Sequence, residues 1–242
     1  MSLYLKNIHK SYNKRTIVSR LNLQVNPGEI VGLLGPNGAG KTTTFYIATG
    51  LIHPDAGHVW LDQQEITSLS LDARARLGIG YLAQQPSIFR YLSVADNLRL
   101  VLEQSGLPPH RQTERLEELM SEFQLQQVAQ TLGSRVSGGE RRRTEIARAL
   151  AVGAAGPDFL LLDEPFAGID PIAVGEIQSL LRQLRDRNLG LLITDHNVRE
   201  TLAITDRAYI LREGQILAGG TSAELYANNL VRDYYLGSGF QE

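Results

Sequence analysis

The sequence predicts an α/β fold whose core is interrupted by a helical insert. Residues 35–42 read GPNGAGKT, which matches the G-x-x-x-x-G-K-[ST] pattern of a phosphate-binding loop. The apolar run 29–34 before the loop is typical of a strand, and residues 43–49 after it read as a helix. Two further apolar runs, 159–162 and 191–193, are continuous, as in strands buried on both faces of a parallel sheet. A strand, a phosphate-binding loop and a helix in this order predict a nucleotide-binding core.

The composition is that of a globular protein. The chain has 242 residues, of which 43% are hydrophobic and 21% are charged, so it can bury a sizeable core. Its formal net charge of -2 gives no support to a nucleic-acid binder, and the absence of cysteine excludes disulfides and thiolate metal sites. No apolar run approaches the roughly 20 residues that span a bilayer. We therefore expect any membrane role to come through a separate partner chain.

The first third of the chain is predicted to consist mainly of strands and turns. Residues 3–5 and 21–25 alternate apolar and polar side chains, as half-buried strands do. Residues 54–57 read as a turn that leads into another strand at 58–61. This pattern extends to about Gln84, after which helical periodicity replaces it.

The middle of the chain, from Ser93 to about Gly153, is predicted to be helical. Ser93 and Asp96 form a helix-capping pattern, and apolar side chains then recur at helical spacing. The sequence Gly-Leu-Pro-Pro at 106–109 separates the first of these helices from the second.

The last part of the chain alternates strands and helices again. A helix is predicted to begin at Pro171 with Asp170 as its cap, residues 207–217 read as a hairpin, and Thr221 caps a last helix. The chain 1–242 therefore reads as a single domain. Its core is expected at about 1–85 and 154–242, and its helical insert at about 86–153.

The phosphate-binding loop carries the groups that bind a nucleoside triphosphate. Its glycines let backbone N–H groups surround the α- and β-phosphates, Lys41 reaches the β- and γ-phosphates, and the Thr42 hydroxyl faces Mg²⁺. The helix that follows places its N-terminus against the phosphates. The alternative is a glycine-rich turn that matches the pattern by chance. The residues of this segment expected to bind ATP are Gly35, Pro36, Asn37, Gly38, Ala39, Gly40, Lys41, Thr42 and Thr43.

Two acidic residues end the apolar run at 159–162. Asp163 is expected to hold Mg²⁺ through water or in its second shell, because this ion keeps several waters. Glu164 is expected to be the general base that polarises the attacking water, a role worth about 10²–10⁴-fold in rate. The alternative is a pair of solvated carboxylates that close a strand.

Residues 137–140 read Ser-Gly-Gly-Glu and precede a strongly helical run, 141–150. A serine hydroxyl, a flexible backbone and a helix N-terminus together form an anion site, although the same residues are a common helix start. With these features the chain resembles the ATP-binding-cassette (ABC) ATPases over essentially its whole length. The signature of that family is LSGGE-like, and Val136 stands in place of its usual leucine. The resemblance implies a P-loop NTPase (RecA-like) core, an antiparallel β subdomain and an inserted α-helical subdomain.

The resemblance also implies a homodimer. In this family two chains meet head to tail and enclose two ATP molecules, and the signature of one chain contacts the γ-phosphate held by the other. Ser137 and Gly139 are assigned this role in trans. Asp170 matches the loop at the dimer seam that touches the partner's site. The cofactors that the resemblance implies are ATP and Mg²⁺.

Three more positions match motifs of the family one by one. Gln84 matches the glutamine that ligates Mg²⁺, although its neighbour Gln85 leaves the register open. His196 matches the switch histidine that contacts the γ-phosphate and orients the water, although a lone histidine after a strand is commonly a turn residue. Tyr12 matches the aromatic residue under the adenine, and a packed strand-end tyrosine is the alternative. Together with Lys41 and Glu164, His196 is assigned to catalysis.

Among ABC ATPases, the subunits of lipopolysaccharide exporters resemble the chain most. The matching segments are 35–46, 86–94, 139–143 and 193–202, and the tail 234–237 with Phe240. The ATPases of branched-chain amino-acid importers and soluble non-transport ATPases are the alternatives. Chromosome and repair ATPases are excluded, because they separate the loop and the signature by long coiled coils. One departure from the family pattern is the longer, glycine-rich connection 151–157.

The resemblance implies a position on the cytoplasmic face of the inner membrane, bound to two integral membrane subunits, and no nucleic acid is expected. Phe89, Arg90 and Tyr91 are candidates for the groove that receives the membrane partner, because aromatic residues with arginine make good interface anchors. The alternative is that Phe89 and Tyr91 belong to the core of the insert. The three arginines 141–143 are either a solvated helix face or, in part, phosphate ligands.

Overall fold

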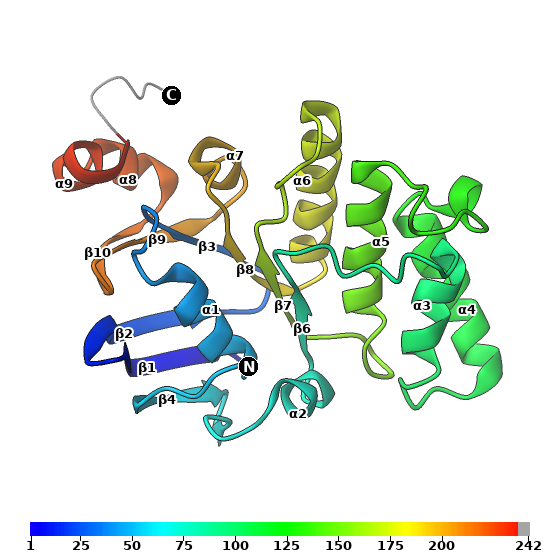
Figure 1. The fold of residues 1–242 in the computed structure, drawn as a ribbon, viewed down its shortest axis with the longest axis horizontal. Helices are drawn as coiled ribbons and strands as arrows, with labels where there is room; N and C mark the ends of the chain where they lie inside the picture. Colours follow the sequence, from blue (N-terminus) through cyan, green and yellow to red (C-terminus); the bar gives the residue numbers. More distant parts are fainter. Residues whose placement is uncertain (237–242) are drawn as a thin grey trace.

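The computed structural model describes residues 1–236, and its centre is a six-stranded sheet of order β10-β9-β3-β8-β7-β6 (Figure 1). Five strands run parallel, and β10 is antiparallel to β9 at one edge. Every residue of β3, β7 and β8 is buried, which is the reason for their continuous apolar sequences. The strands are β3 (Ile30–Leu34), β6 (Ile79–Leu82), β7 (Phe159–Asp163), β8 (Gly190–Thr194), β9 (Arg207–Arg212) and β10 (Gln215–Gly220).

A second, antiparallel sheet of order β2-β1-β4-β5 covers one side of the central sheet (Figure 1). The end of β2 shows why, because its alternate residues Leu21, Leu23 and Val25 are buried. These side chains share one core cluster with Phe45 of α1 and Val31 of β3. The elements here are β1 (Leu3–Tyr12), β2 (Arg15–Val25), β4 (Ala56–Leu61), β5 (Gln64–Glu65), α1 (Lys41–Thr49) and α2 (Leu71–Arg76).

The helical part of the chain lies at the opposite end of the molecule, on the right in Figure 1. Its apolar side chains, among them Leu98, Phe123 and Ile146, share a core cluster with Leu160 of β7 and Ile177 of α6. The elements are α3 (Val94–Leu102), α4 (Pro109–Glu122), η1 (Gln126–Val128), α5 (Gly138–Leu150) and α6 (Pro171–Asp186). The predicted α/β class with an antiparallel sheet and inserted helices is confirmed, whereas the limits 86–153 of the insert stay a prediction.

The C-terminal helices pack against β9 and β10. Leu225 and Val231 join Leu34 and Ile210 in a third core cluster. The elements are α7 (Val198–Leu202), α8 (Ser222–Ala227), α9 (Asn229–Val231) and η2 (Arg232–Leu236). Gly237 and Phe240, which carry part of the tail resemblance, lie outside the described residues. Across residues 1–236, no helix combines the length and the apolar character that crossing a membrane requires.

The helix ends follow the capping signals in the sequence. The Ser93 hydroxyl accepts from the N–H of Asp96, and the Asp170 carboxylate accepts from the N–H groups of Ile172 and Ala173. These bonds satisfy backbone donors that a helix cannot pair internally. The predicted starts of α3 and α6 are therefore correct.

Candidate functional site

The parallel strands bring the predicted site residues together, because their carboxyl ends lie at one edge of the sheet. The phosphate-binding loop follows β3 at this edge, and Asp163 ends β7 beside Thr194 of β8. His196 comes two residues after β8, and Gln84 two residues after β6. Lys41 and His196 are 155 residues apart in sequence, and the order of the strands brings their segments to the same edge.

Two glycines of the loop are required by the close approach of other backbone. Gly35 has φ of 152°, and a Cβ there would lie 2.1 Å from the carbonyl oxygen of Leu211. Gly40 has φ of 102°, and its Cβ would lie 2.7 Å from the carbonyl oxygen of Ile17. A hollow beside the loop is lined by Arg15, Thr16, Ile17, Pro36, Asn37, Gly38, Ala39, Arg212 and Glu213.

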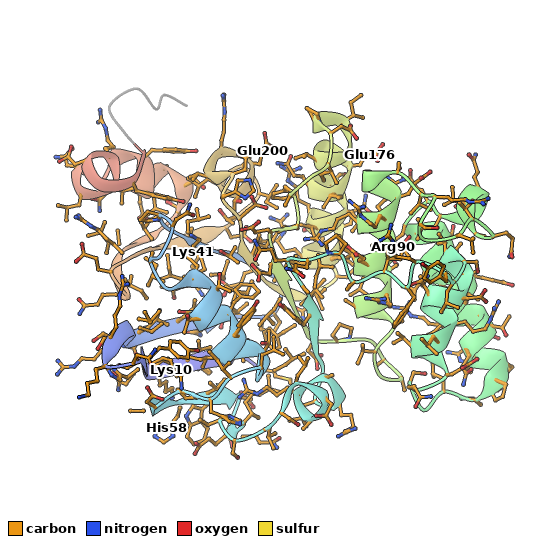
Figure 2. The ribbon with its side chains drawn as sticks, in the orientation of Figure 1. Lys10, Lys41, His58, Arg90, Glu176 and Glu200 are labelled. Carbon is orange, nitrogen blue, oxygen red and sulfur yellow. The ribbon has the colours of Figure 1, made fainter. Side chains whose placement is uncertain are left out.

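Lys41 begins α1, in the left half of Figure 2. Its ammonium group donates to the carbonyl oxygens of Gly35 at 2.7 Å and Pro36 at 3.1 Å. Burial lowers the pKa of Lys41, and the nearby carboxylates of Glu164 and Asp163 oppose this shift. A lysine held within the loop and close to two acids fits a phosphate site. Next to it, Thr42 is exposed and Thr43 is half-buried.

Asp163 is only 1% exposed, and its Oδ2 has no hydrogen-bond partner within residues 1–236. Burial, followed by the charge of Glu164, raises the pKa of Asp163 to about 6. A buried anionic oxygen without a donor is costly unless a cation pairs with it. The Asp163 carboxylate therefore suits the magnesium role that the sequence predicts.

Glu164 has a left-handed backbone with φ of 50°, which is unusual for a residue other than glycine. Its N–H donates to the carbonyl oxygen of Thr194 at 2.7 Å. Its Oε2 lies 3.5 Å from Nδ1 of His196, whose side chain is 64% exposed. Nδ1 also lies 3.5 Å from Oδ1 of Asp195. The predicted base and the predicted switch histidine are thus within ion-pair distance of each other.

Arg142 is a central residue that the sequence analysis missed. It is buried, so the idea that 141–143 form a solvated helix face is wrong for this position. Its guanidinium group makes five hydrogen bonds of 2.6 to 3.2 Å, and burial lowers its pKa. The acceptors are the carbonyl oxygens of Ala83, Asp163, Glu164 and Pro165 and the carboxylate of Glu145.

Glu145 extends this network toward the helical part of the chain. It is buried, and its Oε1 accepts from the N–H groups of Ser87 at 2.6 Å and Ile88 at 3.1 Å. Its Oε2 pairs with Arg142 one turn earlier in α5. The sequence held a signal for this pair, because two opposite charges three residues apart share a helix face with apolar Ile146.

Gln84 follows strand β6, and Tyr12 ends strand β1. Gln84 and Gln85 are both exposed after β6, so the choice between them stays open. Tyr12 ends β1, pairs with Arg15 of β2 and is 46% exposed. The ammonium group of Lys10 lies 5.4 Å from the centre of the Tyr12 ring. Tyr12 therefore offers ring surface beside the hollow that Arg15 lines.

Ser137, Gly139 and Asp170 gather where α5 and α6 begin. Ser137 is exposed and caps α5 in a capping box with Glu140. Gly139 is buried, and a Cβ there would lie 2.9 Å from Cβ of Ala173, so helix packing also requires this glycine. In the described part of the chain, no hydrogen bond or ion pair links these residues to the loop 35–43. Their roles in trans stay predictions.

Phe89, Arg90 and Tyr91 are presented to solvent, with Phe89 46% and Tyr91 90% exposed. The alternative that both aromatic residues belong to the core of the insert is therefore wrong. Asn97 holds the backbone at Phe89 by accepting from its N–H and donating to its carbonyl oxygen. The guanidinium of Arg148 lies 5.0 Å from the centre of the Phe89 ring.

Comparison with known protein families identifies the chain. Residues 18–167 match the family model described as ABC transporter. The chain belongs to the ABC transporter family. Structures of family members share the fold: the ADP conformation of MJ1267, an ATP-binding cassette of an ABC transporter, has a TM-score of 0.86 at 25% identity, covering 98% of this chain and 100% of that one. A dimeric post-hydrolysis state of the cassette MJ0796, bound to ADP and Pi, has a TM-score of 0.79 at 25% identity, covering 91% and 98%.

Curated relatives in this ABC family match nearly end to end. The lipopolysaccharide export system ATP-binding protein LptB of Acidithiobacillus ferridurans is 56% identical over 239 residues, which covers 99% of this chain and 98% of the relative. LptB of Escherichia coli K12 is 53% identical over 241 residues, which covers 99% of both. The predicted family, fold class and enzyme class, an ATPase coupled to transport, are therefore confirmed.

Proposed function

We propose that this chain is the ATP-hydrolysing subunit of a lipopolysaccharide exporter, equivalent to LptB. The observation that carries the proposal is full-length identity of 52% to 56% with proteins of that name from several bacteria. The geometry supports it, because Lys41, Asp163, Glu164 and His196 meet at one edge of the sheet. ATP binding then closes a homodimer, and hydrolysis and product release reopen it.

In the proposed reaction, water attacks the γ-phosphorus of ATP while Glu164 takes a proton from it. The bond between the γ-phosphorus and the bridging oxygen breaks, and ADP and inorganic phosphate leave. Lys41 and the loop amides hold the phosphates and balance the charge that moves to the leaving oxygen. His196, beside Glu164, contacts the γ-phosphate and orients the water. Tyr12 stacks against the adenine.

Mg²⁺ is part of this proposal, with Thr42, Gln84 and Asp163 as the residues that would hold it. The buried, unpartnered Oδ2 of Asp163 and the exposed position of Thr42 support the assignment. When bound, the ion would neutralise part of the negative charge of the phosphates.

The second chain would complete each site. We assign Ser137, Gly139 and Asp170 to contacts across the dimer, since they gather at one place without a bond to the loop 35–43 of their own chain. The dimeric MJ0796 cassette, which has the same fold, supports this arrangement. A monomer would then be nearly inactive.

The membrane partners in this proposal are LptF/LptG-like permeases, bound from the cytoplasmic face of the inner membrane. Phe89, Arg90 and Tyr91 stand at the docking surface. Arg90 lies on the right in Figure 2. It lines a hollow in the surface. The lining of this hollow consists of Pro86, Ile88, Arg90, Gly133, Ser134, Val136 and Arg141.

Replacement of LptB in Escherichia coli tests the function. We expect this chain to sustain growth when the resident LptB is depleted, and its Glu164→Gln variant to fail at equal abundance. Growth with wild-type protein but no lipopolysaccharide export would contradict the proposed cargo. Purification from detergent extract should retain integral membrane proteins, and a preparation that follows ribosomes instead would point to a soluble ATPase.

A further inference from the structure

We propose that Asp195 is a positioning residue for ATP hydrolysis, because its buried carboxylate holds the turn that carries Glu164 and also faces the ring of His196. The inference rests on the proposed roles of those two residues. Asp195 follows β8 directly, and its side chain is fully buried. It is therefore placed between the two catalytic segments without reaching the solvent itself.

The turn at Glu164 needs external support, because its left-handed backbone with φ of 50° is strained for a residue with a side chain. Other elements bind almost every polar backbone group of the turn. Arg142 binds the carbonyl oxygens of Glu164 and Pro165, and Thr194 accepts from the N–H of Glu164. The remaining N–H, that of Phe166, donates to Oδ2 of Asp195 at 3.1 Å. Asp195 thus completes the support of the strained turn.

The other oxygen of Asp195 serves the histidine segment. Oδ1 accepts from the N–H of Asn197 at 2.8 Å and lies 3.5 Å from Nδ1 of His196. Oε2 of Glu164 lies at the same distance, 3.5 Å, from Nδ1. Two carboxylate oxygens on the Nδ1 side of the ring favour the tautomer of His196 that carries its proton on Nδ1. Asp195 therefore holds the backbone beside His196 and favours the tautomer protonated at Nδ1.

An aspartate is needed because both of its oxygens accept. An asparagine at this position has one oxygen and one NH₂ group, so in either orientation a donor faces the N–H of Phe166 or of Asn197. The variant Asp195→Asn keeps the volume of the side chain but releases one of the two catalytic segments. No residue of the phosphate-binding loop contacts the Asp195 carboxylate among its hydrogen bonds, so nucleotide affinity is expected to persist.

Steady-state kinetics of purified protein give the first test. We expect Asp195→Asn to lower kcat about ten- to a hundredfold and to leave KM for ATP within about twofold, since a misplacement near 1 Å costs on the order of 10² in rate. Asp206→Asn is the matched control. Asp206 also accepts a backbone N–H, that of Ile30 at 2.8 Å, but at the opposite edge of the sheet. The kcat of Asp206→Asn should equal that of the wild type.

Coupling to His196 gives the second test. In a His196→Ala background, Asp195→Asn should lower kcat by a clearly smaller factor than in the wild type, because part of its effect is already lost. If Asp195→Asn lowers kcat by the same factor in the wild type and in His196→Ala, Asp195 does not act through His196. Side-chain ¹⁵N NMR of the five histidines, with His196 assigned by its loss in His196→Ala, should show Nδ1 protonated in the wild type and a changed tautomer ratio in Asp195→Asn.

These results separate the inference from the function on which it rests. A wild-type protein that does not hydrolyse ATP would overturn the proposed function. An active wild type with an equally active Asp195→Asn variant would overturn only the positioning role. If Asp195→Asn does not fold, Asp195→Glu replaces it: the longer carboxylate keeps two acceptors but displaces them, and kcat should fall between those of the wild type and the His196→Ala variant. A rate equal to the wild type would contradict the inference.

Discussion

The catalytic edge of the sheet and the segment 84–91 are built in opposite ways. At the edge, Asp163, Arg142 and Asp195 are buried, and their hydrogen bonds fix the groups that would do chemistry. In the segment 84–91, the side chains of Phe89 and Tyr91 face solvent, whereas backbone N–H groups of the segment donate to buried side chains. Glu145 and Asn97 provide these backbone bonds. Enclosed side chains thus position the groups proposed for catalysis, whereas the segment 84–91 presents exposed side chains on a fixed backbone.

One buried pair joins the two regions. Arg142 binds the backbone around Glu164, and its partner Glu145 binds the N–H groups of Ser87 and Ile88. Both residues lie in α5, which starts at the predicted signature. A displacement of α5 would therefore reach the catalytic turn and the exposed segment together. The predictions below test how far each region depends on its own contacts.

The largest effect is expected when the proposed base at the catalytic edge, Glu164, is replaced. Glu164→Gln should lower ATP hydrolysis by about 10²–10⁴-fold, since it removes the base, while MgATP binding persists. Size-exclusion chromatography with MgATP should show a dimer that wild-type protein forms only transiently. Lys41→Ala is the contrasting variant, because nucleotide affinity itself should fall. Turnover close to wild type in Glu164→Gln would rule out the assignment of the base.

The second-largest effect is expected when the buried pair of Arg142 and Glu145, which joins the two regions, is broken. Arg142→Ala should lower the free energy of unfolding by about 3–5 kcal/mol, because it leaves the Glu145 carboxylate buried without its partner. Urea unfolding followed by circular dichroism measures this change. Arg111→Ala is the control, since the Arg111–Glu114 pair is exposed and is expected to contribute under about 1 kcal/mol. A similar loss of unfolding free energy in the two variants would contradict the larger contribution expected of the buried pair.

A smaller effect is expected at Asp163, in protein free of nucleotide and metal. It is a dependence of the free energy of unfolding on pH. The pKa of Asp163 is raised from 3.8 to about 6, so the folded protein holds this proton more tightly than the unfolded chain does. The free energy of unfolding should therefore decrease as pH rises from about 4 to about 6, by roughly 2–3 kcal/mol. Asp163→Asn should remove this dependence and be the more stable protein at pH 7. If the free energy of unfolding changes with pH in the same way in the wild type and in Asp163→Asn, the raised pKa of Asp163 is contradicted.

The smallest effect on the molecule itself is expected at the exposed segment. Tyr91→Ala should change stability by less than about 0.5 kcal/mol and leave basal ATP hydrolysis unchanged, because the side chain is 90% exposed. Recovery of integral membrane proteins in the same purification should nevertheless drop. Leu100→Ala, at another exposed apolar residue, is the control. Full recovery with Tyr91→Ala would place the docking surface elsewhere.

Much of the fold was predictable from local patterns. Continuous apolar runs predicted β7 and β8, glycine and lysine spacing predicted the loop before α1, and caps such as Asp170 predicted helix starts. The buried role of Arg142 was not predictable in the same way. Three consecutive arginines look alike in sequence, and only the packing of α5 against β6, α3 and α6 decides which one is enclosed.

The sequence by itself determined the class of the protein, because the phosphate-binding loop, the acidic strand end and the Ser-Gly-Gly-Glu segment are local motifs with a chemical meaning. The tertiary structure alone decided how these motifs cooperate. It set the left-handed turn of Glu164, the pairing of Arg142 with Glu145 and the position of Asp195 between the catalytic segments. These are contacts between residues far apart in the chain. Their geometry follows from strand order and helix packing, which local sequence does not specify.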